Sequence, residues 1–273
     1  MEDFVMKYSR VLTIAGSDSG GGAGVQADIK AISACGAYTA TAITAVTVQN
    51  TLGVEAVHPV PLEIIEGQIE AVLSDIGADA VKIGMLHSAE VVELVCRMID
   101  KYQPRAVVLD PVMVSTSGHR LIEETAVEAL RKKLIPRSTI ITPNLPEAEI
   151  LIGRKITGQA DFEAATRELA AGGDYSVLLK AGHLDGELLT DIFYDAQTAQ
   201  IHSLTGVRIE TPNKHGTGCT LSSTIAAYLA LGMTLWDAVR SAKEYLEGAI
   251  LSGAKYEIGS GHGPVDHFYR QRR

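Results

Sequence analysis

Apolar and polar residues alternate along this chain in two rhythms. Short runs of mostly apolar residues, such as 10–16, are followed by longer stretches in which apolar residues recur every three or four positions, as Val25, Ile29 and Ile32 do within 23–34. Runs that are apolar throughout are typical of strands buried on both faces, and the wider spacing is typical of helices packed on a core. The pattern therefore predicts strands and helices in alternation.

Extending this alternation along the sequence gives a sheet of mostly parallel strands. Strands are predicted at 10–16, 39–49, 80–85, 105–109, 139–142 and 176–181, and helices at 23–34, 61–76, 88–102, 123–134, from about 146, and at 161–171, 220–231 and 235–251. The regularity breaks at 188–194 and 200–204, which predict an antiparallel hairpin at one edge. Helices would cover both faces of the sheet, so we expect an α/β fold of three αβα layers. Without a linker or repeat, residues 1–273 are expected to form one domain.

Composition and charge narrow the classes of function. Hydrophobic residues make up 46% and charged residues 21% of the 273 positions, as in ordinary globular proteins. The net charge is −9 and the longest basic run is Arg131-Lys132-Lys133, which argues against nucleic acid as a partner. No apolar run approaches the ~20 residues of a membrane span, and the acidic start is unlike a signal peptide. Three widely spaced cysteines are typical of free thiols in a reducing compartment, so we expect a cytoplasmic protein.

Unusual residues gather where the predicted strands end. In an open α/β sheet, ligands bind beyond the carboxyl ends of the strands. The first strand leads into 16–24, a segment with five glycines whose spacing fits neither a dinucleotide fingerprint nor a P-loop. Either a backbone that approaches a ligand closely or a flexible turn accounts for this segment.

The segment 215–220 (HGTGCT), directly before an apolar helical stretch, is the sharpest local signal. Gly216 and Gly218, with Thr217 between them, free the backbone to turn N–H groups toward one point, and the helix start adds unpaired amides and a positive dipole end. These features predict a site for a phosphoryl group. Cys219 lies at the helix start, where a thiol pKa tends to fall, so a thiolate there could accept the proton of an attacking hydroxyl. The alternative is a small, buried, structural cysteine.

Oxygen-bearing residues follow two further predicted strands. Asn144 and Glu147 would face one side of a helical turn and, with Asp110, could hold Mg²⁺ through water. The alternative for Asn144 and Glu147 is a box that caps a helix. Lys180 ends an apolar strand, where its charge either meets a nucleotide phosphate or reaches solvent.

Together, these motifs resemble the bacterial hydroxymethylpyrimidine/phosphomethylpyrimidine kinases of thiamine biosynthesis, within the ribokinase-like superfamily. The resemblance runs almost end to end, and its most specific stretches are GAGVQAD at 22–28, VQNT at 48–51, KIGML at 82–86, LDPVMV at 109–114, ITPNLPEAE at 141–149 and HGTGCT at 215–220. It implies a ribokinase-like fold, ATP and Mg²⁺, and a homodimer. It also implies phosphorylation of 4-amino-5-hydroxymethyl-2-methylpyrimidine and then of its monophosphate.

The resemblance further implies roles for individual residues. Asp28 and Gln49 would hydrogen-bond the aminopyrimidine, whose edge carries donors and acceptors. Cys219 would be the base beside an anion hole formed by Gly216, Thr217 and Gly218. The pyrimidine pocket would be shaped by Gly16, Ala23, Met85 and Val112, and the nucleotide would be bound by Asp110, Asn144, Glu147, Lys180 and Thr217, with Asp110 and Glu147 also serving the metal.

The sequence departs from the common family pattern in three places. The first loop reads Asp18-Ser19-Gly20-Gly21, where many members have Asp-Pro-Ser-Gly or Asp-Ser-Ser-Gly. Thr116 and His119 stand where Lys and Asp are frequent, and 180–183 reads KAGH instead of KGGH. The missing lysine removes one contact to the phosphate of the second substrate, which bears on the second phosphorylation.

Other functions fit parts of the sequence. A pyridoxal kinase is the nearest rival, because some relatives accept vitamin B6 compounds, and an enzyme with both activities is a further option; Val48-Gln49-Asn50 favours the pyrimidine. A non-catalytic pyrimidine-binding protein on the same fold is a rival of another class. The glycine loop with Cys219 argues against it, because a sensor needs no base beside an anion hole. A nucleoside or sugar kinase is a weaker option.

Overall fold

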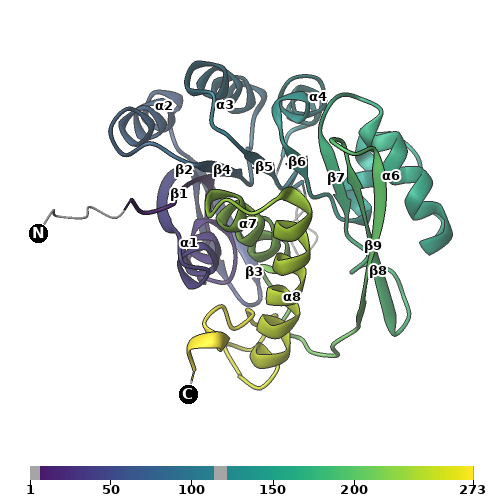
Figure 1. Ribbon diagram of the computed structural model, residues 1–273. Helices are drawn as coiled ribbons and strands as arrows, with labels where there is room; N and C mark the ends of the chain where they lie inside the picture. Colours follow the sequence, from purple (N-terminus) through teal and green to yellow (C-terminus); the bar gives the residue numbers. More distant parts are fainter. Residues whose placement is uncertain (1–6, 114–121, 273) are drawn as a thin grey trace, which may run out of the picture.

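The computed structural model describes residues 7–113 and 122–272, whose strands form one nine-stranded sheet in the order β3-β2-β1-β4-β5-β6-β7-β8-β9 (Figure 1). The strands are β1 (Arg10–Ser17), β2 (Tyr38–Asn50), β3 (Gly53–Pro59), β4 (Ala80–Ile83), β5 (Val107–Leu109), β6 (Ile140–Ile141), β7 (Ser176–Leu179), β8 (Leu188–Asp195) and β9 (Gln200–Val207). The six strands from β2 to β7 in this order pair in parallel, and β8 and β9 form an antiparallel hairpin. The predicted mostly parallel sheet with an edge hairpin is confirmed.

The second edge of the sheet differs from the prediction. β3 pairs antiparallel with β2 through a tight turn between Asn50 and Gly53. This strand is not predicted from the sequence, because most residues of Gly53–Pro59 are exposed and show no apolar alternation. The sheet therefore carries antiparallel strands at both of its edges.

Helices cover both faces of the sheet and complete the three predicted layers (Figure 1). The helices are α1 (Gly24–Ala34), α2 (Leu62–Ala71), α3 (Ala89–Tyr102), α4 (Glu124–Ala129), α5 (Leu145–Ile152), α6 (Phe162–Ala170), α7 (Thr217–Ala230) and α8 (Leu235–Gly253). One core packs α2 to α6 against one face, and a second core packs α1, α7 and α8 against the other.

Local sequence explains where several helices begin and end. Ser88 and Thr234 cap α3 and α8 by accepting hydrogen bonds from backbone N–H groups of the first turn. α2 and α4 are shorter than predicted because each passes into a π-helical turn, Val72–Ile76 and Leu130–Leu134.

Helix α7 positions the site. It begins at Thr217, three residues before the predicted start, because Gly216 adopts a left-handed conformation (φ 79°) that turns the chain into the helix. From Thr220 onward its small and β-branched residues are buried on almost all sides. The start of α7 is thereby fixed against the carboxyl edge of the sheet.

Candidate active site

A cavity of about 690 Å³ lies at the carboxyl ends of the parallel strands. Its lining contains all but one of the residues predicted for the site, namely Gly16, Ala23, Gln49, Met85, Asp110, Val112, Asn144, Glu147, Lys180, Gly216, Thr217, Gly218 and Cys219. The prediction that several strand ends converge on one cleft is confirmed. Thr116 and His119, which depart from the family pattern, lie outside the described residues.

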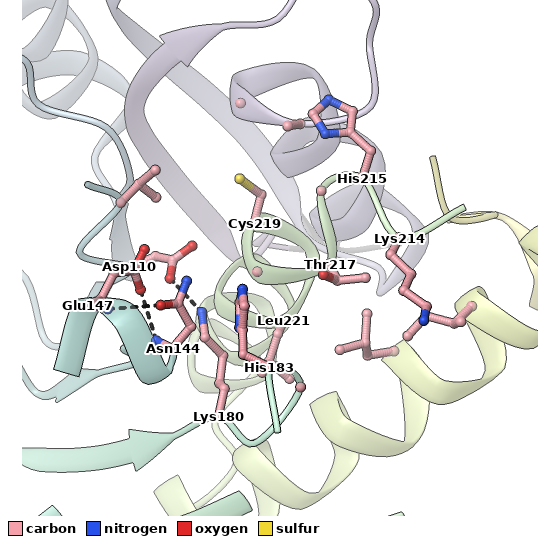
Figure 2. A pocket seen from close by; sticks show the side chains of 18 of the residues that line it. Asp110, Asn144, Glu147, Lys180, His183, Lys214, His215, Thr217, Cys219 and Leu221 are labelled. Atoms are coloured by element: carbon pink, nitrogen blue, oxygen red, sulfur yellow. Dashed lines mark hydrogen bonds and ion pairs between the residues drawn. The ribbon is translucent and has the colours of Figure 1, made fainter. Parts of the chain in front are cut away.

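The glycine loop and the start of α7 lie at the centre of this cavity. Figure 2 shows Thr217 and Cys219 at the first turn of α7, facing Asp110 and Lys180. A methyl group on Gly218 would lie 3.2 Å from Lys180 Nζ, so the absence of a side chain lets the cation approach the backbone. First-turn N–H groups have no acceptor within their own helix, and the Thr217 N–H makes only a long 3.4 Å hydrogen bond to the carbonyl oxygen of Lys214 before the helix.

The thiol of Cys219 differs from its prediction. Burial raises its pKa to about 11, although the nearby positive charge of Lys82 and a backbone hydrogen bond with Gly24 act in the opposite direction. The carboxylates of Asp28 and Asp110 reinforce the increase. The expectation of a lowered pKa was wrong because desolvation of the thiolate outweighs the helix start, and Cys219 carries its proton at neutral pH in the ligand-free protein.

A buried cluster of charged residues faces Cys219 from the neighbouring strand ends (Figure 2). Lys180 Nζ lies 2.9 Å from Asp110 Oδ1, which also accepts a hydrogen bond from Thr142. Burial would lower the pKa of Lys180, but the charges of Asp110 and Glu147 raise it above its ordinary value. Lys180 is therefore a fixed cation that faces the cavity, and its alternative as a solvent-exposed lysine is wrong.

Asn144 and Glu147 form a complete capping box at the start of α5. The Asn144 side chain accepts from the Glu147 N–H at 3.0 Å, and Glu147 Oε2 accepts from the Asn144 N–H at 2.8 Å. The capping alternative is thus confirmed, and both residues also line the cavity. Burial raises the pKa of Glu147 to about 7, opposed by the positive charge of Lys180 and reinforced by the negative charge of Asp110.

Asp28 is the predicted site residue that the cavity lining does not include. Its side chain is fully buried, and both of its oxygens lie 2.8–2.9 Å from Lys82 Nζ. Thr13 and Ser223 also donate hydrogen bonds to it. These donors occupy the carboxylate, so the structure gives Asp28 a place behind the site, as the counterion of Lys82, and not a direct contact with a pyrimidine.

Several polar residues of the cavity were not predicted from the sequence, and three of them, Lys82, Asp18 and His215, have buried charged partners. Lys82 lies within the apolar strand β4, and a lysine inside such a strand was the available signal. Asp18 and His215 come from the two glycine-rich segments and lie 2.9 Å apart, from Asp18 Oδ2 to His215 Nε2. Nothing in the spacing of their motifs shows that these two segments meet.

The three-layer fold, with a cavity at the carboxyl edge of its sheet and the glycine-rich helix start at Gly216–Cys219 inside it, places the chain in the class of ribokinase-like small-molecule kinases. This class also contains solved structures that match the whole fold. The chain belongs to the phosphomethylpyrimidine kinase family, whose profile matches residues 18–266.

Individual relatives agree with this assignment. The chain is 50% identical over 260 residues to the hydroxymethylpyrimidine/phosphomethylpyrimidine kinase of Rhizobium meliloti. The aligned region covers 95% of this chain and 97% of the relative. Among solved structures, phosphomethylpyrimidine kinase of Clostridium difficile is 46% identical with a TM-score of 0.78, covering 88% of this chain and 99% of the other. Pyridoxal kinase of Staphylococcus aureus, in complex with AMP-PCP and pyridoxal, is 35% identical with a TM-score of 0.89, covering 98% and 96%.

Among residues 7–113 and 122–272, no helix is long and apolar enough to cross a membrane. No group of three or more His, Cys, Asp or Glu side chains in the same part of the chain is arranged to hold a metal ion. A metal at Asp110 and Glu147 would therefore need further ligands from water or substrate.

Proposed function

We propose that this protein transfers phosphate from ATP to 4-amino-5-hydroxymethyl-2-methylpyrimidine and then to the resulting monophosphate, in thiamine biosynthesis. The observation that carries the proposal is that one cavity contains Gln49, whose amide can hydrogen-bond a small ring, and Cys219. The same cavity contains Gly216, Thr217 and Gly218, which we call the anion-binding loop. The full-length match to a kinase named for both substrates supports the same activity.

We assign the phosphoryl transfer to the start of α7. The hydroxymethyl oxygen of the pyrimidine forms a bond to the γ-phosphorus as the bond between that phosphorus and the ADP oxygen breaks. N–H groups of Gly216, Thr217 and Gly218 would stabilise the charge on the transferring group. Cys219 would take the hydroxyl proton in its thiolate form, which is the minor form at neutral pH in the ligand-free protein and which the charge of Lys82 favours.

The remaining residues would hold the two substrates. Gln49 would hydrogen-bond the pyrimidine, while Gly16, Ala23, Met85 and Val112 shape its pocket. Lys180, Asn144 and Thr217 would contact the nucleotide phosphates.

Mg²⁺ fits the two carboxylates at the nucleotide side of the cavity. Asp110 and Glu147 offer oxygen donors, which this ion prefers, and the small number of protein ligands suits an ion that keeps much of its water shell. Bound there with ATP, Mg²⁺ would neutralise phosphate charge.

Pyridoxal phosphorylation is a second candidate, because pyridoxal kinases share the fold over nearly the whole chain. A side-by-side assay with ATP and Mg²⁺ tests both functions by comparing kcat/KM on hydroxymethylpyrimidine and on pyridoxal. We expect the pyrimidine to be preferred. A preference for pyridoxal would assign the protein to vitamin B6 metabolism instead.

We further propose a homodimer in the cytoplasm, built from one ribokinase-like domain that spans 1–273. The family resemblance suggests the dimer, and the free cysteines are consistent with a reducing compartment. Light scattering of the purified protein tests the dimer.

A further inference from the structure

His215 connects the pyrimidine side of the cavity to the anion-binding loop. It directly precedes Gly216, and its Nε2 lies 2.9 Å from Asp18 Oδ2 in the first glycine-rich loop and 3.3 Å from the side-chain amide of Gln49. Gly22 lies so close that a methyl group on it would overlap the His215 ring, and a methyl group on Gly216 would overlap the Gly22 carbonyl. The two loops therefore interlock around one imidazole.

The partners of Asp18 fix the proton of His215. Asp18 is almost fully buried and accepts hydrogen bonds from the N–H groups of Gly20, Gly22 and Ala23. Burial alone would raise its pKa, but these donors and His215 lower it below the ordinary value, so the group is an ionised carboxylate. A carboxylate can only accept, so His215 Nε2 must carry a hydrogen and donate it.

This proton decides how the Gln49 amide must point. In the structure, Gln49 Nε2 faces His215 Nε2, and Gln49 Oε1 lies 3.2 Å from Thr47 Oγ1. This orientation would place two hydrogen-bond donors, Gln49 Nε2 and His215 Nε2, against each other. The single hydroxyl hydrogen of Thr47 already has an acceptor in Ser17 O at 2.8 Å, so Thr47 can accept from Gln49 instead. Amide oxygen and nitrogen have nearly the same shape, and their hydrogen-bond partners decide between them. Exchanging the two atoms removes the opposed donors: Gln49 Nε2 can donate to Thr47, and Gln49 Oε1 faces the His215 Nε2 hydrogen, which it shares with Asp18.

We propose that His215, oriented by Asp18, is a positioning residue that locks the Gln49 amide with its oxygen toward the anion-binding loop. In this orientation Gln49 selects an acceptor molecule that carries a hydrogen-bond donor beside its hydroxymethyl group. This inference rests on the proposed function and names its selectivity device. On the aminopyrimidine, the group next to the hydroxymethyl carbon is an amine, which donates. On pyridoxal it is a carbonyl, whose oxygen would face the Gln49 oxygen.

Kinetics on two acceptors test the lock. In His215→Ala the amide is free to turn, so the ratio of kcat/KM on hydroxymethylpyrimidine to that on pyridoxal should fall by about 10-fold, the worth of one hydrogen bond. In a Gln49→Ala background, the same His215 substitution should leave the ratio unchanged. Lys214→Ala, one residue earlier and also lining the cavity, is the matched control, because it perturbs the loop without touching Gln49 and should affect both acceptors equally.

A ratio that changes equally with and without Gln49 would overturn the proposal, because His215 would then act only through the loop. The tautomer gives a second readout that does not depend on turnover. Two-dimensional ¹H–¹⁵N spectra of the histidine rings, with His215 assigned by its loss in His215→Ala, should show hydrogen on Nε2; hydrogen on Nδ1 alone would refute the lock. If the wild type ignores the pyrimidine but phosphorylates pyridoxal, the proposed function fails, while the spectra and the Gln49–His215 coupling measured on pyridoxal still decide the lock.

Discussion

Lys82 Nζ lies 2.8 Å from Asp28 Oδ1, and both side chains are fully buried. Burial would lower the pKa of Lys82, but the charge and hydrogen bond of Asp28, together with the nearby charges of Cys219 and Asp110, hold the pKa above its ordinary value. The lysine is therefore a permanent cation between β4 and α1 that also borders the cavity. Through Ser223, which donates to Asp28, the pair is tied to α7 one turn after Cys219.

Removing one partner of this pair should be far more costly than removing both. Lys82→Met leaves a buried, unpaired carboxylate, and we expect it to lower the free energy of unfolding by about 3–5 kcal/mol. The double variant Lys82→Met/Asp28→Asn should recover most of the loss. Urea unfolding followed by circular dichroism measures both, and Lys101→Met, which removes an exposed pair with Glu70, is the control that should leave the unfolding curve nearly unchanged. Equal losses in the single and double variants would contradict this account.

Cys219 should be both essential for turnover and slow to react with alkylating reagents. We expect Cys219→Ala to lower kcat by about 10²-fold or more while the pyrimidine still binds. Because burial raises the thiol pKa to about 11, its alkylation by iodoacetamide should be slow at pH 7 and should still accelerate above pH 9. A Cys35→Ala/Cys96→Ala background isolates this thiol. Unchanged turnover in Cys219→Ala would remove the residue from the mechanism.

Most of the fold could be predicted because its central strands are buried on both faces. Val107 to Leu109 of β5 form an uninterrupted apolar run, and Val81 and Ile83 of β4 continue the pattern on either side of the buried Lys82. The missed strand β3 has the opposite property, since its exposed residues are free of packing constraints. Strand pairing at an edge is held by backbone hydrogen bonds, which every residue can make, proline only as an acceptor.

The site was predictable where its chemistry is local in the sequence. The glycine loop before Cys219 and the Asn144–Glu147 turn each bring their groups together within a few residues. Asp28 was misplaced because its partner Lys82 is 54 residues away, and only the fold shows that the two carboxylate oxygens are already occupied. The Asp18–His215 pair spans 197 residues and was missed for the same reason.

Gly216 should tolerate no side chain. Its φ of 79° disfavours other residues, and a methyl group would overlap the carbonyl oxygen of Gly22, so Gly216→Ala must displace one of the two loops. We expect kcat to fall by about 10²-fold or more, as when an anion-hole donor is lost. Gly232→Ala is the matched control: its φ is 92°, nothing lies near its Cβ position, and only about 1–2 kcal/mol of stability should be lost with kcat retained. Full activity in Gly216→Ala would argue against the anion hole.

Glu147 should make stability depend on pH in a direction opposite to that of most carboxylates. Burial raises its pKa from 4.5 to about 7, so its contribution is fully present below pH 4.5 and is lost as pH rises through 7. Glu147→Gln keeps an oxygen for the Asn144 N–H but cannot ionise. Relative to the wild type, it should gain about 1–3 kcal/mol of unfolding free energy between pH 5 and 8 in urea titrations. Glu149→Gln, on the same helix, is the control of opposite sign, because hydrogen bonds with Lys155 and Ile156 lower the pKa of Glu149. Parallel stability curves for Glu147→Gln and the wild type would show that Glu147 does not titrate in this range.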